Sequence, residues 1–421
     1  MPVDANLEST QNQKTDQTIA SVSATHSGAG VIIVGAGLAG WGVVDAIRAK
    51  DQDIAITMIT ADSGDRYHKP MLTMAISQNK SAADLIRATG VDAAETANIK
   101  LMTNTRVTQI DADNQQVMVA ANRGDNQVTQ ALAYDNLVLA MGAHPAFPKS
   151  LPEELVWHVN HIERFAQLQA ELANSSQKIA IVGAGMVGTE IAEDLLKAGH
   201  NITLIDLNDA PLAQMLPPQA TSRIKDAVRS QGIEFLGGCQ VTQVTALNDG
   251  QYEVAVAGLK SNTDKADSGN INKERSIIVD HVIASTGLLV DDKLPESAGI
   301  EFDRRTGIVV DEQTLETSQP HIYAIGDCMS IGGVACRYVA PLRAQAATIA
   351  DSVLGRDHDG YTHKPPMIRL KNKAISVMVT GVPNGGATWQ TVTDTDEELV
   401  MEQQDDKEEI AATVTIKLPA A

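Results

Sequence analysis

Two glycine-rich segments contain the residues whose spacing is best suited to chemistry. The first is Gly35-Ala36-Gly37-Leu38-Ala39-Gly40, and the second is Gly183-Ala184-Gly185-Met186-Val187-Gly188. In this pattern the first glycine allows a tight turn, the second lets the backbone approach a pyrophosphate, and the third lets a helix pack closely on a strand. A helix that begins at such a turn offers free N–H groups to phosphates. The sequence therefore predicts two dinucleotide sites in one chain.

An acidic residue about 20 positions after the first glycine binds the ribose hydroxyls of NAD. Asp206 stands near that position in the second segment, and the following Leu207-Asn208-Asp209 contains no arginine for a 2′-phosphate. We therefore expect the second site to prefer NAD(H) to NADP(H). In the first segment the nearest acid is Asp62, at a longer offset. A role for Asp62 in binding FAD competes with its interpretation as a solvated loop residue.

Two dinucleotides in one chain favour a flavin and a nicotinamide, because a hydride must pass between two redox cofactors. Further along, an apolar run ends in Gly326-Asp327, where the glycine permits close approach and the carboxylate can meet a polyol. Pro341 then opens an alanine-rich helix that extends to about Leu354, since proline is favoured in the first helical turn. The positive end of this helix could face a flavin ring.

The elements that must position these residues are two strand–turn–helix–strand units. The predicted strands are Val31–Val34 and residues 54–60 in the first unit, and Lys178–Val182 and Asn201–Ile205 in the second. This repetition predicts an α/β fold with two Rossmann-like domains, one for FAD and one for NAD.

The order of the motifs predicts a discontinuous FAD domain, residues 30–148 and 289–356, into which the NAD domain, residues 149–288, is inserted. Residues 361–421 are expected to form a small C-terminal domain of the α+β type. Residues 1–29, which are rich in Thr, Gln, Ser and Asp, are expected to be a disordered extension.

Composition excludes several classes of function. The formal net charge of −20 over 421 residues argues against binding to nucleic acid, whose phosphates need clustered Lys and Arg. No apolar run is long enough to span a membrane or to act as a signal peptide. The three cysteines, Cys239, Cys328 and Cys336, form no Cys-x-x-Cys pair and suit a reducing cytoplasm. Without a cysteine pair to reduce, the chain is expected to pass its electrons to an external acceptor. The oligomeric state is open.

With these motifs the sequence resembles the pyridine nucleotide-disulfide oxidoreductase superfamily of flavoproteins. Beside the two glycine segments, the matching pieces are Leu139-Ala140-Met141-Gly142, Ala284-Ser285-Thr286-Gly287 and Tyr323-Ala324-Ile325-Gly326-Asp327. The resemblance implies a glutathione-reductase-like arrangement with FAD as cofactor and NADH as substrate. It also implies that Gly142 and Gly287 belong to the cofactor sites.

A narrower resemblance is to bacterial rubredoxin–NAD reductases. The segment Tyr67-His68-Lys69-Pro70-Met71-Leu72-Thr73 looks like their Tyr-x-Lys-Pro-x-Leu-Ser segment, and Tyr338-Val339-Ala340-Pro341-Leu342 resembles their Tyr-x-x-Pro-Leu helix start. Lys371 falls where they carry a lysine near the start of the last domain. Tyr338 and Pro341 are thereby implied as cofactor contacts.

The same resemblance implies the roles of several side chains. Lys69 and Pro70 should lie along the flavin, Asp327 should bind the FAD ribityl chain, and Glu190 should approach the nicotinamide. Lys69 and Glu190 are the two predicted catalytic residues. The alternative interpretation is that Lys69 is an ordinary surface lysine and that Glu190 is a solvated acid on a helix.

By this resemblance the chain passes electrons from NADH through FAD singly to rubredoxin, in support of a bacterial alkane hydroxylase. An NADH-dependent ferredoxin reductase and an oxygen-reducing NADH oxidase are alternatives, and so is a flavin-binding signalling protein with incidental turnover. Met74 stands where ferredoxin reductases carry a lysine, which disfavours that branch. The acidic region 394–409 departs from the usual ending of rubredoxin reductases.

Overall fold

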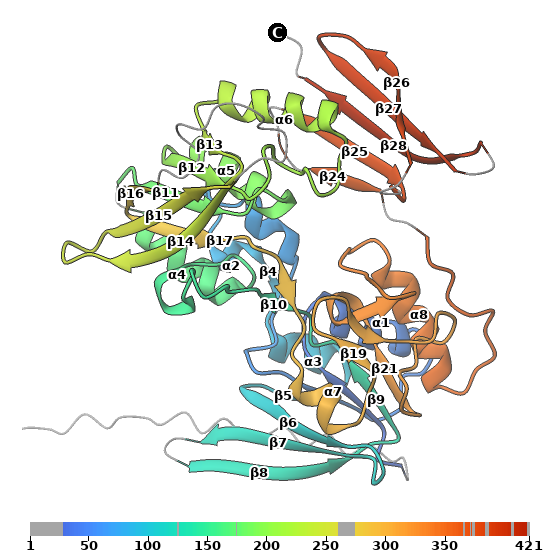
Figure 1. The fold of residues 1–421 in the computed structure, drawn as a ribbon. Helices are drawn as coiled ribbons and strands as arrows, with labels where there is room; N and C mark the ends of the chain where they lie inside the picture. The colour runs from blue at the N-terminus through green and yellow to red at the C-terminus, as the bar shows by residue number, and fades with distance from the viewer. Residues whose placement is uncertain are drawn as a thin grey trace, which may run out of the picture.

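The computed structural model describes residues 28–123, 126–173, 175–259, 274–364, 367–370, 372, 375–383, 387–405 and 408–418. Most of the predicted N-terminal extension lies outside the described residues, and so does Lys371. Figure 1 shows two units built around parallel sheets and a separate antiparallel sheet near the C-terminus.

A five-stranded sheet with the order β21-β9-β1-β2-β5 forms the centre of the first unit, and all its pairs are parallel. Its strands are β1 (Val31–Val34), β2 (Ile56–Ile59), β5 (Lys100–Met102), β9 (Asn136–Leu139) and β21 (Ile322–Ala324). β1 is buried along its whole length, as expected for a parallel sheet covered on both faces. Because β21 belongs to this sheet, the first glycine turn and the Gly326-Asp327 segment end at the same carboxyl edge.

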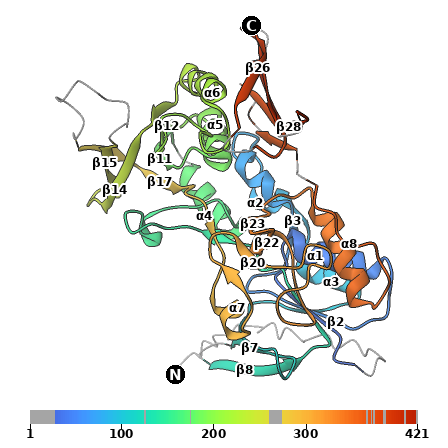
Figure 2. The ribbon, with the colours of Figure 1, turned by 45° about the vertical axis from the view of Figure 1, so that its right-hand side comes forward.

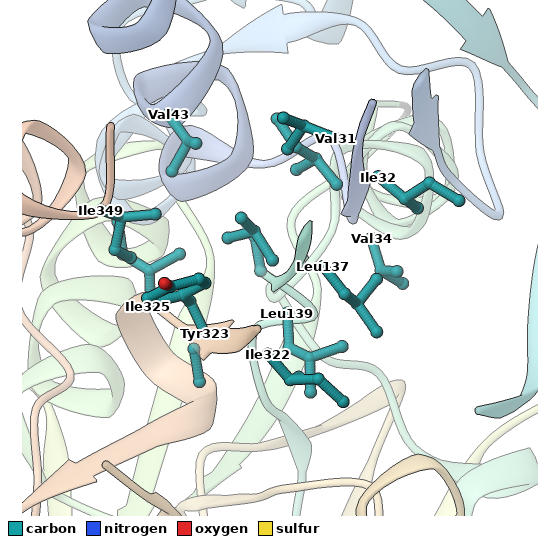
Figure 3. Packing of buried hydrophobic residues seen from close by; sticks show 14 of the residues in the cluster. Val31, Ile32, Val34, Val43, Leu137, Leu139, Ile322, Tyr323, Ile325 and Ile349 are labelled. Atoms are coloured by element: carbon teal, nitrogen blue, oxygen red, sulfur yellow. The ribbon is translucent and has the colours of Figure 1, made fainter. Parts of the chain in front are cut away.

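Helices α1 (Leu38–Arg48) and α8 (Leu342–Val353) pack together on one face of this sheet, as Figure 2 shows. Figure 3 shows Val43 of α1, Ile349 of α8 and Ile325 after β21 on the same side of the strands. Helix α8 has Pro341 as its N-cap and Leu354 as its C-cap, so the helix predicted to open at Pro341 is confirmed.

Smaller elements complete this unit. Beside the central sheet lie two sheets, ordered β6-β7-β8 and β19-β20-β22-β23, and the short pairs β3-β4 and β10-β18. Their strands are β3 (Arg66–Tyr67), β4 (Ile86–Ala88), β6 (Thr105–Asp111), β7 (Gln116–Arg123), β8 (Asn126–Ala133), β10 (His144–Pro145), β18 (Leu288–Leu289), β19 (Phe302–Asp303), β20 (Gly307–Val309), β22 (Met329–Ile331) and β23 (Val334–Ala335). The short helices are η1 (Lys69–Met74), α2 (Ala82–Leu85), α3 (Gly90–Ala97), α7 (Lys293–Ser297) and η3 (Gly326–Cys328). Another short helix, η2 (Glu153–Leu155), belongs to the second unit, since Leu155 packs against the core of that unit.

The second unit repeats the architecture with a parallel sheet ordered β13-β12-β11-β17. Its strands are β11 (Lys178–Val182), β12 (Asn201–Ile205), β13 (Glu234–Leu236) and β17 (His281–Ala284). Its helices are α4 (Ile162–Leu172), α5 (Met186–Lys197) and α6 (Pro218–Ser230). An antiparallel sheet of β14 (Cys239–Ala246), β15 (Tyr252–Gly258) and β16 (Arg275–Val279) covers one side. The predicted α/β fold with two Rossmann-like units is confirmed.

The C-terminal sheet has the order β24-β25-β28-β27-β26 and packs its apolar face on the second unit. Its strands are β24 (Ile368–Leu370), β25 (Ser376–Gly381), β26 (Trp389–Asp394), β27 (Glu398–Gln404) and β28 (Ile410–Lys417). Asp394 pairs with Arg223 of α6, next to which the sheet lies in Figure 1. The α+β composition predicted for this domain is corrected, since its described residues form strands only. The alternating β-branched residues of β25 and β28 explain this preference.

Candidate functional site

The first glycine turn connects β1 to α1 at the carboxyl edge of the sheet. Gly35 has a φ of 106°, and a Cβ added there would lie 2.3 Å from the carbonyl oxygen of Ala140. A Cβ at Gly40 would lie 2.0 Å from the carbonyl oxygen of Gly35, whereas a Cβ at Gly37 would meet nothing within 4 Å. The first and third glycines are therefore required by packing, and the second borders open space. Helix α1 has Gly37 as its N-cap and no capping side chain, as in a phosphate-binding turn.

The second glycine turn has the same geometry between β11 and α5. A Cβ at Gly183 would lie 2.3 Å from the carbonyl oxygen of Ser285, and one at Gly188 would lie 1.9 Å from that of Gly183. Gly185 again borders open space and is the N-cap of α5 without a capping side chain. Beside this turn, the buried Oγ of Ser285 has no hydrogen-bond partner in the described part of the chain. Both turns therefore fit the pyrophosphate of a dinucleotide.

Asp206 lies directly against the second turn. Its Oδ2 accepts the N–H of Ala184 at 2.6 Å, and its Oδ1 accepts the N–H of Asn208 at 2.7 Å. The carboxylate is only partly buried. This is the place that the sequence predicted for a ribose-binding acid, and its contact with ribose stays a prediction.

Asp62 is held differently. Its Oδ1 accepts the hydroxyl of Thr60 at 2.6 Å and the N–H of Gly64 at 2.9 Å, while its Oδ2 lies 2.8 Å from Nε2 of His161. Burial alone would raise the pKa of Asp62, but the hydrogen bonds from His161, Thr60 and Gly64 outweigh burial and lower the pKa to about 2. Both oxygens are thus engaged by the chain itself. A role of Asp62 toward FAD stays a prediction.

Gly326 brings its neighbour Asp327 to the first turn. With a φ of 78°, a Cβ at Gly326 would lie 3.1 Å from Cβ of Ala39 and 3.3 Å from Cδ2 of Leu342. The segment is therefore wedged between the starts of α1 and α8. Burial lowers the pKa of Lys69, and the negative charge of Asp327 opposes this shift.

Five further predicted residues, Gly142, Gly287, Tyr338, Pro341 and Pro70, lie in loops and at helix starts. Gly142 and Gly287 have φ angles of 67° and 99°, and a Cβ at either would meet nothing within 4 Å. Pro341 is buried, and Tyr338 is partly buried, which raises its pKa. Pro70 is the second residue of the short helix η1, next to Lys69.

Glu190 is a buried residue of α5 and is only 5% exposed, so it is not a solvated acid on a helix. Its Oε2 accepts the hydroxyl of Thr73 at 2.6 Å. Thr73 belongs to η1, the helix that begins with Lys69. The two predicted catalytic residues are therefore connected through η1.

Several residues in this region carried no sequence motif of their own. Asp194 on α5 accepts the N–H groups of Ile76 and Ser77, and Arg337 donates to the carbonyl oxygen of Leu288 at 3.0 Å. Burial lowers the pKa of Arg337, while Asp327 opposes that shift. These contacts join segments distant in sequence, which is why spacing did not reveal them.

Cys328, the cysteine next to Asp327, is not placed for thiol chemistry. Cys328 is fully buried, its Sγ lies 3.2 Å from the carbonyl oxygen of Leu139, and burial raises its pKa to about 11. Cys239, Cys328 and Cys336 are all free. The described ranges contain no cluster of His, Cys, Asp and Glu that could hold a metal, and no helix in them is long and apolar enough to cross a membrane.

Comparisons with known proteins agree with this geometry. The pyridine nucleotide-disulphide oxidoreductase family matches residues 29–349. The nitric oxide reductase FlRd-NAD(+) reductase of Klebsiella pneumoniae is 32% identical over 365 residues, which are 86% of this chain and 89% of that protein. A NADH:rubredoxin oxidoreductase from Clostridium acetobutylicum has a TM-score of 0.71 and 22% identity, covering 92% of this chain and 91% of its own. A NAD-dependent persulfide reductase from A. fulgidus has a TM-score of 0.80 and 21% identity, and the match covers 93% of this chain and 74% of that protein.

Proposed function

Because the chain belongs to the pyridine nucleotide-disulphide oxidoreductase family, whose members use FAD with NAD(P)H, we propose that it oxidises NADH through FAD and passes the electrons singly to rubredoxin. The membership makes it an oxidoreductase and a flavoprotein.

The chain's own residues would divide the work between two sites. The turn around Gly37, with Asp327 and Lys69 beside it, would hold FAD. The turn around Gly185, with Asp206 and the nearby Glu190, would hold NADH. When bound, FAD takes up a hydride from NADH and releases the electrons one at a time. The protein contributes position, charge and exclusion of water.

The burial of Cys328 is the observation that best supports electron transfer to an external acceptor. It is the cysteine next to Asp327, yet it is fully buried and its raised pKa keeps the thiol protonated. A protein that cannot pass electrons to its own disulfide must pass them to another molecule. Rubredoxin is favoured by the Tyr67–Thr73 segment and by the relative named a FlRd-NAD(+) reductase.

The final destination of the electrons has two candidates. Supply of an alkane hydroxylase stays a prediction of the sequence resemblance. The name of the Klebsiella relative includes nitric oxide reductase, which favours a nitric oxide-reducing electron-transfer chain as the second candidate. A cytoplasmic location is likewise a prediction, drawn from the sparse cysteines.

Steady-state oxidation of NADH by the purified flavoprotein tests the choice of acceptor. Rubredoxin, a ferredoxin and dissolved oxygen are compared at equal NADH concentration. The proposal expects saturable stimulation by rubredoxin that exceeds both controls by about tenfold or more, the difference that about 1.4 kcal/mol of transition-state stabilisation produces. Equal rates with ferredoxin, or a fast reaction with oxygen alone, would assign the chain to a ferredoxin reductase or an oxidase.

A further inference from the structure

Helix α5 directs two buried carboxylates, one helical turn apart, at the segment that follows Lys69. Glu190 and Asp194 are spaced four residues apart and therefore lie on one face of α5. Oε2 of Glu190 accepts the hydroxyl of Thr73 at 2.6 Å. Oδ2 of Asp194 accepts the N–H of Ile76 at 3.0 Å, and its Oδ1 accepts the N–H of Ser77 at 3.2 Å.

Asp194 binds this segment through both of its carboxylate oxygens. Its Oδ1 also accepts the hydroxyl of Ser77, so three donors from two consecutive residues meet one carboxylate. The residue is 6% exposed. Hydrogen bonds from N–H and O–H groups to a buried, charged acceptor are strong and directional. This contact therefore fixes both the distance and the orientation of residues 76–77 relative to α5.

The two segments joined by this contact extend to the two proposed cofactor sites. Helix α5 begins at the Gly185 turn, and η1 begins at Lys69 and ends two residues before Ile76. From these contacts we infer that Asp194 is a positioning residue, which holds η1 on α5 and thereby fixes Lys69 relative to the nicotinamide site. The inference rests on the NADH-to-FAD half of the proposed function and is independent of the acceptor.

The expected effect follows from the geometry that hydride transfer requires. Reacting atoms must approach to about 3–3.5 Å, and a displacement of about 1 Å can cost about a hundredfold in rate. Asp194→Asn replaces one of the two carboxylate oxygens with an NH2 group. That group cannot accept a hydrogen bond from Ile76 or Ser77. The limiting rate of flavin reduction by NADH should fall by about tenfold or more, while the NADH concentration at half-saturation changes by less than about threefold.

Anaerobic stopped-flow mixing of the oxidised flavoprotein with NADH measures both quantities without rubredoxin. Asp280→Asn is the matched control, since that carboxylate also accepts a backbone N–H, from Lys178 at 2.7 Å, at the opposite end of β11 from the glycine turn. The control should reduce at the wild-type rate. A failure of rubredoxin as acceptor would not affect this experiment.

Hydrogen–deuterium exchange of the same proteins gives a readout independent of turnover. Asp194→Asn should speed exchange at the amides of Ile76 and Ser77, and leave the C-terminal sheet at wild-type rates. Ser77→Ala, which removes one donor only, should show a smaller slowing of flavin reduction and serves if Asp194→Asn does not retain FAD. The inference would be overturned if both variants reduced the flavin at the wild-type rate, or if they lost only NADH affinity. Faster hydrogen–deuterium exchange throughout the chain would also overturn it, because the substitution would then have loosened the whole fold.

Discussion

Nε2 of His161 lies 2.8 Å from Oδ2 of Asp62, and this contact joins the second unit of the protein to the first. The other ring nitrogen, Nδ1, accepts the N–H of Glu163 at 3.3 Å and so caps the N-terminus of α4. Asp62, expected from sequence to be a cofactor residue or a solvated loop acid, is therefore part of a link between the two units.

Asp62→Asn should lower the free energy of unfolding. Since burial is outweighed by hydrogen bonds from His161, Thr60 and Gly64, the pKa of Asp62 is lowered to about 2. An unfolded aspartate has a pKa of about 3.9, so the ionised carboxylate stabilises the fold above that pH, and this is lost as the pH falls towards about 2. With 31% of the side chain exposed, we expect a loss of about 1 kcal/mol at neutral pH.

Urea unfolding of wild type and Asp62→Asn measures this difference at neutral pH and at about pH 3. The difference should shrink at the lower pH, because Asp62 is then largely protonated in the unfolded wild type while it is still ionised in the folded protein. A difference of the same size at both pH values would contradict the assignment.

Protonation of His158 should lower the free energy of unfolding in mild acid. Burial is the largest cause that lowers the pKa of His158, and the neighbouring basic side chains Arg164, His161, Lys69 and His144 lower it further, to about 4. An unfolded histidine has a pKa of about 6.5, so the stability that depends on neutral His158 is complete above that pH and is lost as the pH falls towards about 4. The loss should reach about 1–2 kcal/mol after solvent screening. In His158→Gln the unfolding midpoint should fall less between neutral pH and about pH 5 than in wild type; parallel curves would argue against it.

The second and third glycines of the Gly183 turn should respond differently to alanine. Gly185→Ala adds a methyl group in open space, so we expect little change in stability but a loss of NADH affinity of about tenfold, or about 1.4 kcal/mol. Gly188→Ala places Cβ 1.9 Å from a backbone oxygen and should destabilise the fold by about 1–3 kcal/mol. Calorimetric NADH binding and thermal unfolding distinguish the two. Unchanged affinity in Gly185→Ala would remove the nicotinamide site from this turn.

Asp206→Ala combined with Leu207→Arg should move the preference from NADH towards NADPH. The change removes a carboxylate that would repel a 2′-phosphate and supplies a guanidinium that binds one. We expect the ratio of kcat/KM for the two nucleotides to change by about a hundredfold, or about 2.7 kcal/mol. Leu207→Ala is the control and should retain the NADH preference. If the double variant also keeps the wild-type ratio, Asp206 does not face the ribose.

Local patterns were sufficient to predict the two turns and the start of α8, because glycine and proline constrain the backbone where they stand. The sequence could not predict which side chains meet across the units. Thr73 and Glu190 are 117 residues apart, and Asp62 and His161 are 99 apart. Such pairs depend on how the units pack, and no spacing rule encodes them. The acidic region after Asp394 was hard to interpret for a related reason, since its described part contains the turn that follows β26 and the strand β27 of an antiparallel sheet.

The most direct test of electron transfer to rubredoxin is a single-turnover reaction without oxygen. The flavoprotein is first reduced with one equivalent of NADH and then mixed with oxidised rubredoxin, and the return of the flavin absorbance and the bleaching of rubredoxin are recorded together. We predict that both signals change at the same rate, that the rate rises with rubredoxin concentration, and that two rubredoxins are reduced for each flavin. Flavin that stays reduced with rubredoxin, but is reoxidised rapidly by a ferredoxin or by oxygen, would contradict the proposed acceptor.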